Sequence, residues 1–126
     1  MMRIPATVIL ALALAGCSDT VRTEFESLDD AKQAKAFDRG WLPPALPDGA
    51  TEIVEVNDLD SNSGTGSFRF PPDAMPQYLE TMATEHGAVV VRHSSGITMA
   101  VSNAGTHWRI ELDPKNRTGV YSVQCR

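Results

Sequence analysis

Residues 88–125, AVVVRHSSGITMAVSNAGTHWRIELDPKNRTGVYSVQC, carry the clearest secondary-structure signal in the chain. Apolar side chains alternate with polar ones, and the turn formers Ser-Ser-Gly, Asn-Ala-Gly and Asp-Pro-Lys-Asn separate the alternating runs. A period of two indicates strands with one buried face, and short turns join antiparallel neighbours. We therefore predict antiparallel strands over 88–92, 97–101, 107–112 and 121–125.

The same alternation occurs earlier in the chain. Residues 51–57 and 65–70 predict a hairpin, with Phe68 and Phe70 on one face and Arg69 on the other. Between this hairpin and the later strands, apolar residues repeat at i, i+4 and i+7, namely Met75, Leu79 and Met82. This is the spacing of one helix face. We predict a helix over 74–85.

A further helix is predicted near the start of the domain. Thr23 with Glu26 fits a capping box, and Ser27 is a second possible start. Gly40 is a natural end, because glycine adopts the left-handed conformation that closes many helices. The element order becomes α-β-β-α-β-β-β-β. This order predicts one small α+β domain, mainly antiparallel sheet with two helices on one face.

Residues 41–49, WLPPALPDG, contain three prolines, which exclude a helix. The interleaved Trp41, Leu42 and Leu46 favour an extended segment pinned across the domain by its apolar side chains. The alternative is a proline-rich ligand for another protein.

The N-terminus predicts export. Arg3 is the only charge before Cys17, and the 13 residues Ile4–Gly16 carry none. A bilayer-spanning helix needs about 20 apolar residues, so this run is too short to remain as a span. A basic N-terminus, a short apolar run and small residues before a cleavage site are typical of a secretory signal peptide.

Leu14-Ala15-Gly16-Cys17 resembles the lipobox of bacterial lipoproteins. The resemblance implies cleavage before Cys17 and lipid on its thiol, whereas an ordinary secretory signal would leave a stray thiol there. Family sorting rules place Asp directly after the cysteine for inner-membrane retention. Here Ser18 follows and Asp comes next, so we expect the outer membrane, facing the periplasm. The predicted organisation is a signal peptide (1–16), a polar tether (17–24) and a globular domain (25–126).

The net charge and the cysteine content limit which binding partners and disulfides the protein can have. The chain carries a formal net charge of −5, and loss of Arg3 with the signal makes it −6. An acidic chain lacks the electrostatic footprint of a nucleic-acid binder. With Cys17 lipidated, Cys125 is the remaining thiol, so no internal disulfide is expected. We favour a buried, inert Cys125 on the last strand, and a disulfide to another chain is the alternative.

Several sequence patterns resemble functional sites. Residues 58–64, DLDSNSG, resemble a calcium loop, but the sixth position is Ser63 and the twelfth is Arg69, where an EF-hand needs Gly and Glu. An acidic hairpin loop is the simpler interpretation. With Arg69, it is also the most plausible polar patch for a ligand. We expect no metal and no cofactor.

The histidines predict no catalytic centre. His86, His93 and His107 lack zinc-ligand spacing. Ser94 and Ser95 lie near His93, but there is no nucleophile elbow and no phosphate-binding loop. We expect no enzymatic activity. An enzyme would need a pocket that joins distant groups such as His93 and His107.

Residues 39–47, RGWLPPALP, followed by Ala50, Ile53, residues 57–60 and 68–70, are similar to a group of short bacterial envelope proteins without an assigned activity. The resemblance covers about the first half of the mature chain and transfers no catalytic residue. We expect a lipid-anchored envelope protein that acts through protein contacts. The alternative is a small ligand-binding or inhibitor module directed at a cell-wall enzyme.

Overall fold

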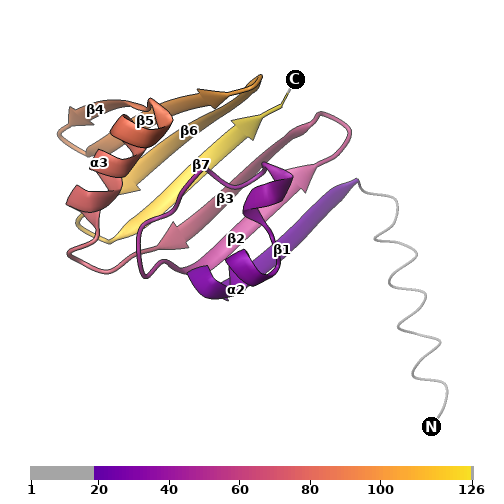
Figure 1. Ribbon diagram of the computed structural model, residues 1–126, viewed down its shortest axis with the longest axis horizontal. Coiled ribbons are helices and arrows are strands. Elements are labelled where there is room, and N and C mark those ends of the chain that lie inside the picture. The colour runs from indigo at the N-terminus through magenta and orange to yellow at the C-terminus, as the bar shows by residue number, and fades with distance from the viewer. Residues whose placement is uncertain (1–18, 126) are drawn as a thin grey trace, which may run out of the picture.

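The computed structural model describes residues 19–125. Its main feature is one seven-stranded antiparallel sheet with the order β1-β2-β3-β7-β6-β5-β4 (Figure 1). The strands are β1 (Thr20–Ser27), β2 (Thr51–Asp58), β3 (Ser63–Arg69), β4 (Val89–His93), β5 (Gly96–Asn103), β6 (Thr106–Asp113) and β7 (Thr118–Gln124). The helical segments are α2 (Leu28–Gln33), the single 3-10 turn η1 (Phe37–Arg39) and α3 (Met75–His86).

Two meanders make up the sheet. β1, β2 and β3 follow one another, and β4 to β7 run back from the opposite edge. α3 makes the crossing between them, and the pairing of β3 with β7 joins the two halves from Ser63↔Gln124 to Arg69↔Thr118. The six predicted strands are all present, and the helix predicted over 74–85 corresponds to α3.

The predicted fold class is wrong: the domain is mainly β rather than α+β with two helices. α3, at 12 residues, is the one substantial helix in residues 19–125, and α2 has only six. Ser27 does cap α2, because its Oγ accepts the Asp30 N–H at 3.2 Å. The chain leaves the helix well before Gly40, since Lys35 adopts a left-handed φ of 57°.

Residues 20–27 are the element that the sequence prediction missed. They form β1 instead of a polar tether and the first turn of a helix, and they pair with β2 from Thr20↔Asp58 to Ser27↔Thr51. Thr23 and Glu26, read as a capping box, are therefore strand residues. The sheet thus begins three residues after Cys17, which lies outside the described residues.

One face of the sheet carries the core. Figure 1 shows α2 and α3 on the same side of the sheet. The 41–50 segment lies on this side too: Tyr78 Oη donates to the Ala45 carbonyl at 2.8 Å, and Trp108 Nε1 donates to the Trp41 carbonyl at 3.3 Å. The segment is therefore pinned across the core, as predicted. The opposite face of the sheet is open.

Candidate functional site

No other element of residues 19–125 covers the open face of the sheet. Three hollows lie along it, with volumes of about 950, 410 and 280 Å³. Val120 lines the first and third of them, and Ser122 lines the second. The floor of this face therefore runs along β7, near the middle of the sheet.

Cross-strand register fixes which side chains meet on this face. Directly paired residues of antiparallel strands point to the same side, so each set of paired positions forms a row across the sheet. One row runs from Arg22 on β1 to Val89 on β4, and the next runs from Glu24 to Val91. The first row is Arg22, Val56, Thr65, Ser122, Arg109, Ala100 and Val89; the second is Glu24, Val54, Ser67, Val120, Glu111, Thr98 and Val91.

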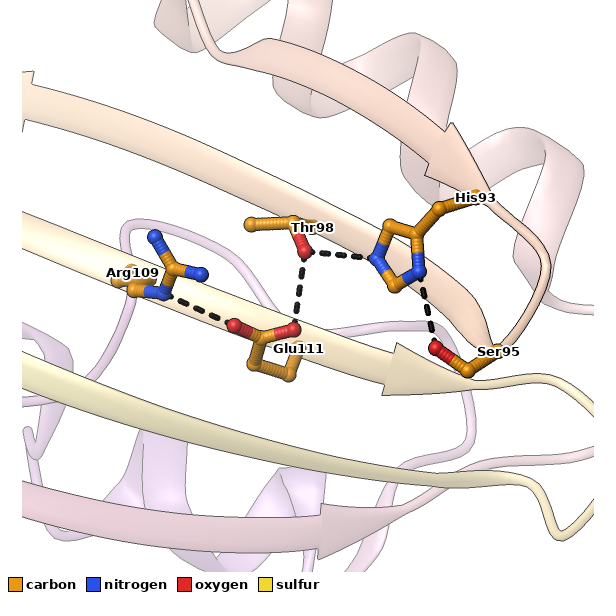
Figure 2. A network of polar contacts seen from close by, with 5 residues as sticks. All are labelled: His93, Ser95, Thr98, Arg109 and Glu111. Atoms are coloured by element: carbon orange, nitrogen blue, oxygen red, sulfur yellow. Dashed lines mark hydrogen bonds and ion pairs between the residues drawn. The ribbon is translucent and has the colours of Figure 1, made fainter.

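A hydrogen-bonded network occupies the end of this face nearest β4 (Figure 2). Thr98 Oγ1 donates to Glu111 Oε1 at 2.9 Å and lies 2.9 Å from His93 Nε2. Because the single Thr98 proton goes to Glu111, His93 Nε2 must be the donor to Thr98. In the neutral ring Nδ1 is then an acceptor, and Ser95 Oγ donates to it at 3.0 Å.

Glu111 is the charged centre of this network. Arg109 Nε lies 2.8 Å from Glu111 Oε2. The hydrogen bond from Thr98 lowers the pKa of Glu111 most, and the hydrogen bond and charge of Arg109 lower it further. The network therefore keeps Glu111 ionised and holds His93 in one tautomer. It can present oriented donors and acceptors to a bound surface.

A second polar cluster is buried under the covered face. Glu55 and Asn57 are only 1% and 5% exposed, and Asn57 Nδ2 donates to Glu55 Oε1 at 2.7 Å. Glu55 Oε2, Asn57 Oδ1 and Tyr121 Oη have no hydrogen-bond partner among the described residues. Burial, together with the nearby Glu55 charge, raises the pKa of Tyr121. Arg39 from η1 supplies the opposing charge, with Nη2 4.0 Å from Glu55 Oε2.

Glycines on β3 make room for this cluster. A Cβ on Gly66 would collide with the Tyr121 ring, and a Cβ on Gly64 would collide with Asn57 Oδ1. The sequence contains a signal for this cluster. One side of β2 carries Ile53, Glu55 and Asn57. The apolar Ile53 marks this side as buried, so alternation places the acidic Glu55 and the polar Asn57 in the core as well.

A pocket lies on the covered side of the sheet, between α2, the 41–50 segment and α3. It has a volume of about 260 Å³. Phe37, Tyr78 and Pro44 contribute apolar or aromatic lining, and Lys32 and Asp48 bring opposite charges to it. A pocket near the lower end of the usual range for small ligands, about 300–1,000 Å³, suits a fragment-sized molecule.

The predicted polar patch does not form as expected. In the 58–64 loop, Asp58 Oδ1 accepts the backbone N–H groups of Asp60 and Ser61 at 3.0 and 3.3 Å, so it closes the turn. A hydrogen bond with Asp19 raises the pKa of Asp60. Arg69 lies at the far end of β3 and pairs with Glu52 at 3.7 Å. The structure therefore does not bring Arg69 to this loop.

The histidines also remain apart. His93 joins the network at the end of β4, whereas His107 is the second residue of β6, near the opposite end of the strands, and its Nδ1 lies 2.6 Å from Ser102 Oγ. His86 ends α3. Within residues 19–125, no group of three or more His, Cys, Asp or Glu side chains is placed to hold a metal ion.

Cys125 is a free thiol that follows β7 and is half-buried instead of fully buried. Its backbone N–H donates to the Asn62 carbonyl at 2.9 Å. In the part of the chain that the structure describes, no helix is long and apolar enough to cross a bilayer.

Comparison with known proteins gives one match. Residues 19–69 match the family model described as the YbbD head domain, which covers β1, α2, η1, β2 and β3. The match is a similarity to a bacterial envelope-type family over less than half of the chain, and it falls on the residues that carry the resemblance to short envelope proteins. No curated protein and no solved structure matches the chain.

Proposed function

We propose that this protein is a lipid-anchored envelope component that works through protein contacts made by the open face of its sheet. The observation that carries the proposal is the asymmetry of the sheet. Of the five large apolar side chains that are exposed in residues 19–125, three lie on the open face: Val89 (64%), Val91 (53%) and Val120 (51%). Apolar side chains grouped on one exposed face are typical of interaction surfaces.

The anchoring half of the proposal rests on the sequence around Cys17. Two or more acyl chains on that residue would hold the protein stably, because each buried CH₂ contributes about 0.8 kcal/mol. An acidic mature chain gains no attraction to anionic headgroups, so lipid has to supply the binding. Ser18 directly after Cys17, where Asp would favour inner-membrane retention, favours the outer membrane, facing the periplasm.

Metabolic labelling with a radioactive fatty acid tests the anchor. We expect label in the wild-type chain and none in Cys17→Ala. Label that persists in the variant would contradict lipidation at Cys17.

In-cell photo-crosslinking tests the contact surface. A benzophenone amino acid at Ser122, in the middle of the open face, is expected to form a reproducible protein adduct. The same probe at Glu80, exposed on α3 on the covered side, is the matched control. Equal or absent adducts at the two positions would contradict docking through the open face.

The pocket beside α3 supports a second candidate, a small-ligand module directed at a cell-wall enzyme. Lys32 and Asp48 suit a compact ligand with an apolar body and both charges. Thr81 also lines the pocket, so Thr81→Trp should fill it. Fragment screening by NMR is expected to shift Phe37 and Thr81 resonances in the wild type, with no Phe37 shift in the filled variant. Unchanged wild-type spectra would dismiss this candidate.

A further inference from the structure

We propose that the partner of the open face is a second copy of this chain, docked face to face about a two-fold axis. This inference rests on the proposed function, because it identifies the protein that the open face contacts. Its basis is the order of charges in the two central rows of that face, which makes the surface complementary to itself.

Within these two central rows, each strand that carries charge contributes one arginine and one glutamate. On β1, Arg22 precedes Glu24 by two residues, and on β6, Arg109 precedes Glu111 by two. Strand register places both arginines in one row and both glutamates in the next. The two rows lie about 7 Å apart, the length of two strand residues.

A two-fold axis that runs parallel to the rows and midway between them inverts their order in the second copy. Arg22 then faces Glu24 of the second copy, and Arg109 faces Glu111 of the second copy. The reciprocal contacts follow from the symmetry, as in any isologous interface. All four arginines of such a dimer meet a glutamate.

Three of the five uncharged pairs of positions in the two rows also bring like side chains together under the same operation. Val56 faces Val54 of the second copy, and Val89 faces Val91 of the second copy. Thr65 faces Ser67 of the second copy, which pairs one hydroxyl with another. Val89 and Val91, the two most exposed valines, therefore cover each other, whereas Val120 faces Ser122 and Thr98 faces Ala100 of the second copy. Small side chains on β2, β3 and β7 allow two sheets to approach the usual stacking distance of about 10 Å.

The intramolecular pairs do not oppose this docking. Arg22 and Glu24 lie 2.8 Å apart, but their side chains are 59% and 63% exposed. Arg109 is similarly open, at 67%, and its partner Glu111 is 39% exposed. Exposed pairs of this kind contribute about 0–1 kcal/mol, so the same groups are available for contacts across an interface.

The proposed anchor is compatible with this symmetry. The axis runs from the β1 edge of the sheet toward the β4 edge, so both copies present β1 on the same side. β1 is the strand nearest Cys17 in sequence. Two lipids can therefore enter one membrane whose normal is the two-fold axis.

Charge exchange in the full-length protein tests the interface. The purified protein in nonionic detergent is expected to have the protein mass of a dimer by light scattering. Arg22→Glu with Arg109→Glu, and separately Glu24→Arg with Glu111→Arg, should raise the dissociation constant at least about tenfold, because like charges then face each other. An equimolar mixture of the two double variants should restore the dimer, since it recreates every opposite pair.

The control variant reverses one charge of each sign away from the open face, on α3 and α2. Glu80→Arg with Lys32→Glu is expected to remain a dimer. A thiol probe covers the case in which a charge variant fails to fold. Val120→Cys in a Cys125→Ser background should cross-link to itself with a bismaleimide of about 10 Å span, whereas Glu80→Cys should not.

A monomer at every concentration, or a mixture that stays monomeric while both variants are folded, would overturn the inference. Its failure is distinguishable from failure of the proposed function. If the probe at Ser122 forms an adduct whose mass differs from that of two copies of the chain, the open face is an interaction surface but its partner is another protein. Absence of any adduct would contradict the proposed function itself.

Discussion

The ring of Tyr121 on β7 lies directly over Gly66 on β3, in the space that a Cβ on Gly66 would occupy. The two residues are register partners on the covered face. Gly66 is also paired with Glu55 on β2, so the glycine leaves the room in which the phenol approaches the buried carboxylate.

Gly66→Ala should destabilise the domain by about 1–3 kcal/mol, the usual cost of overpacking a core. Urea unfolding measures the change in the free energy of unfolding. In a Tyr121→Val background the same substitution should cost much less, because the colliding ring is absent. An equal cost in both backgrounds would show that the clash is not the cause.

Arg39→Ala should destabilise the domain by about 1–2 kcal/mol. Breaking a fully buried pair costs about 3–5 kcal/mol, and we discount that figure because Arg39 is 47% exposed and 4.0 Å from Glu55. Arg22→Ala, which breaks an exposed pair, should change stability by less than about 1 kcal/mol. Adding Glu55→Gln to Arg39→Ala should recover part of the loss. Additive effects of the two changes would argue against the pair.

Thr98→Val should raise the pKa of Glu111 toward the ordinary glutamate value, since it removes the hydrogen bond that lowers this pKa most. NMR titration of the Glu111 carboxyl measures it. A lowered pKa in the folded state stabilises the fold above the ordinary glutamate pKa, and this contribution disappears as the pH falls through the lowered value. Thr98→Val should therefore lose stability at neutral pH and little in strong acid.

Tyr78→Phe should cost about 1 kcal/mol, because it removes the 2.8 Å hydrogen bond to the Ala45 carbonyl. Thermal unfolding gives the size of the loss. Hydrogen exchange of Leu46 should quicken if the bond pins the 41–50 segment. Unchanged exchange would mean that apolar packing alone fixes the segment.

Strand alternation predicted six strands correctly but could not predict β1. In the sequence TVRTEFES, Phe25 is the one large apolar residue on the covered side with strong burial, at 8% exposure. An edge strand buries little, so its sequence stays polar and resembles a tether. Thr23 and Glu26 have the spacing of a helix cap, and pairing with β2 outweighs that local preference.

Less of the candidate site could be predicted from the sequence. Register places Arg22 in the same row as Arg109, four strand pairings away, and no local spacing in the sequence reveals a row of that kind. The His93 network joins β4, β5 and β6 in the same way. Glu55 is the exception, because its inward position on β2 follows from simple alternation with Ile53.

The position of β1 at the sheet edge sets how far the protein can reach from a membrane. With Cys17 lipidated, only Ser18 and Asp19 separate it from β1, and three residue steps span at most about 10 Å. Seven strands at about 4.8 Å spacing make the sheet about 30 Å wide. Standing on its β1 edge, the domain would reach about 40 Å into the periplasm. Its contacts would therefore be with molecules beside the membrane surface.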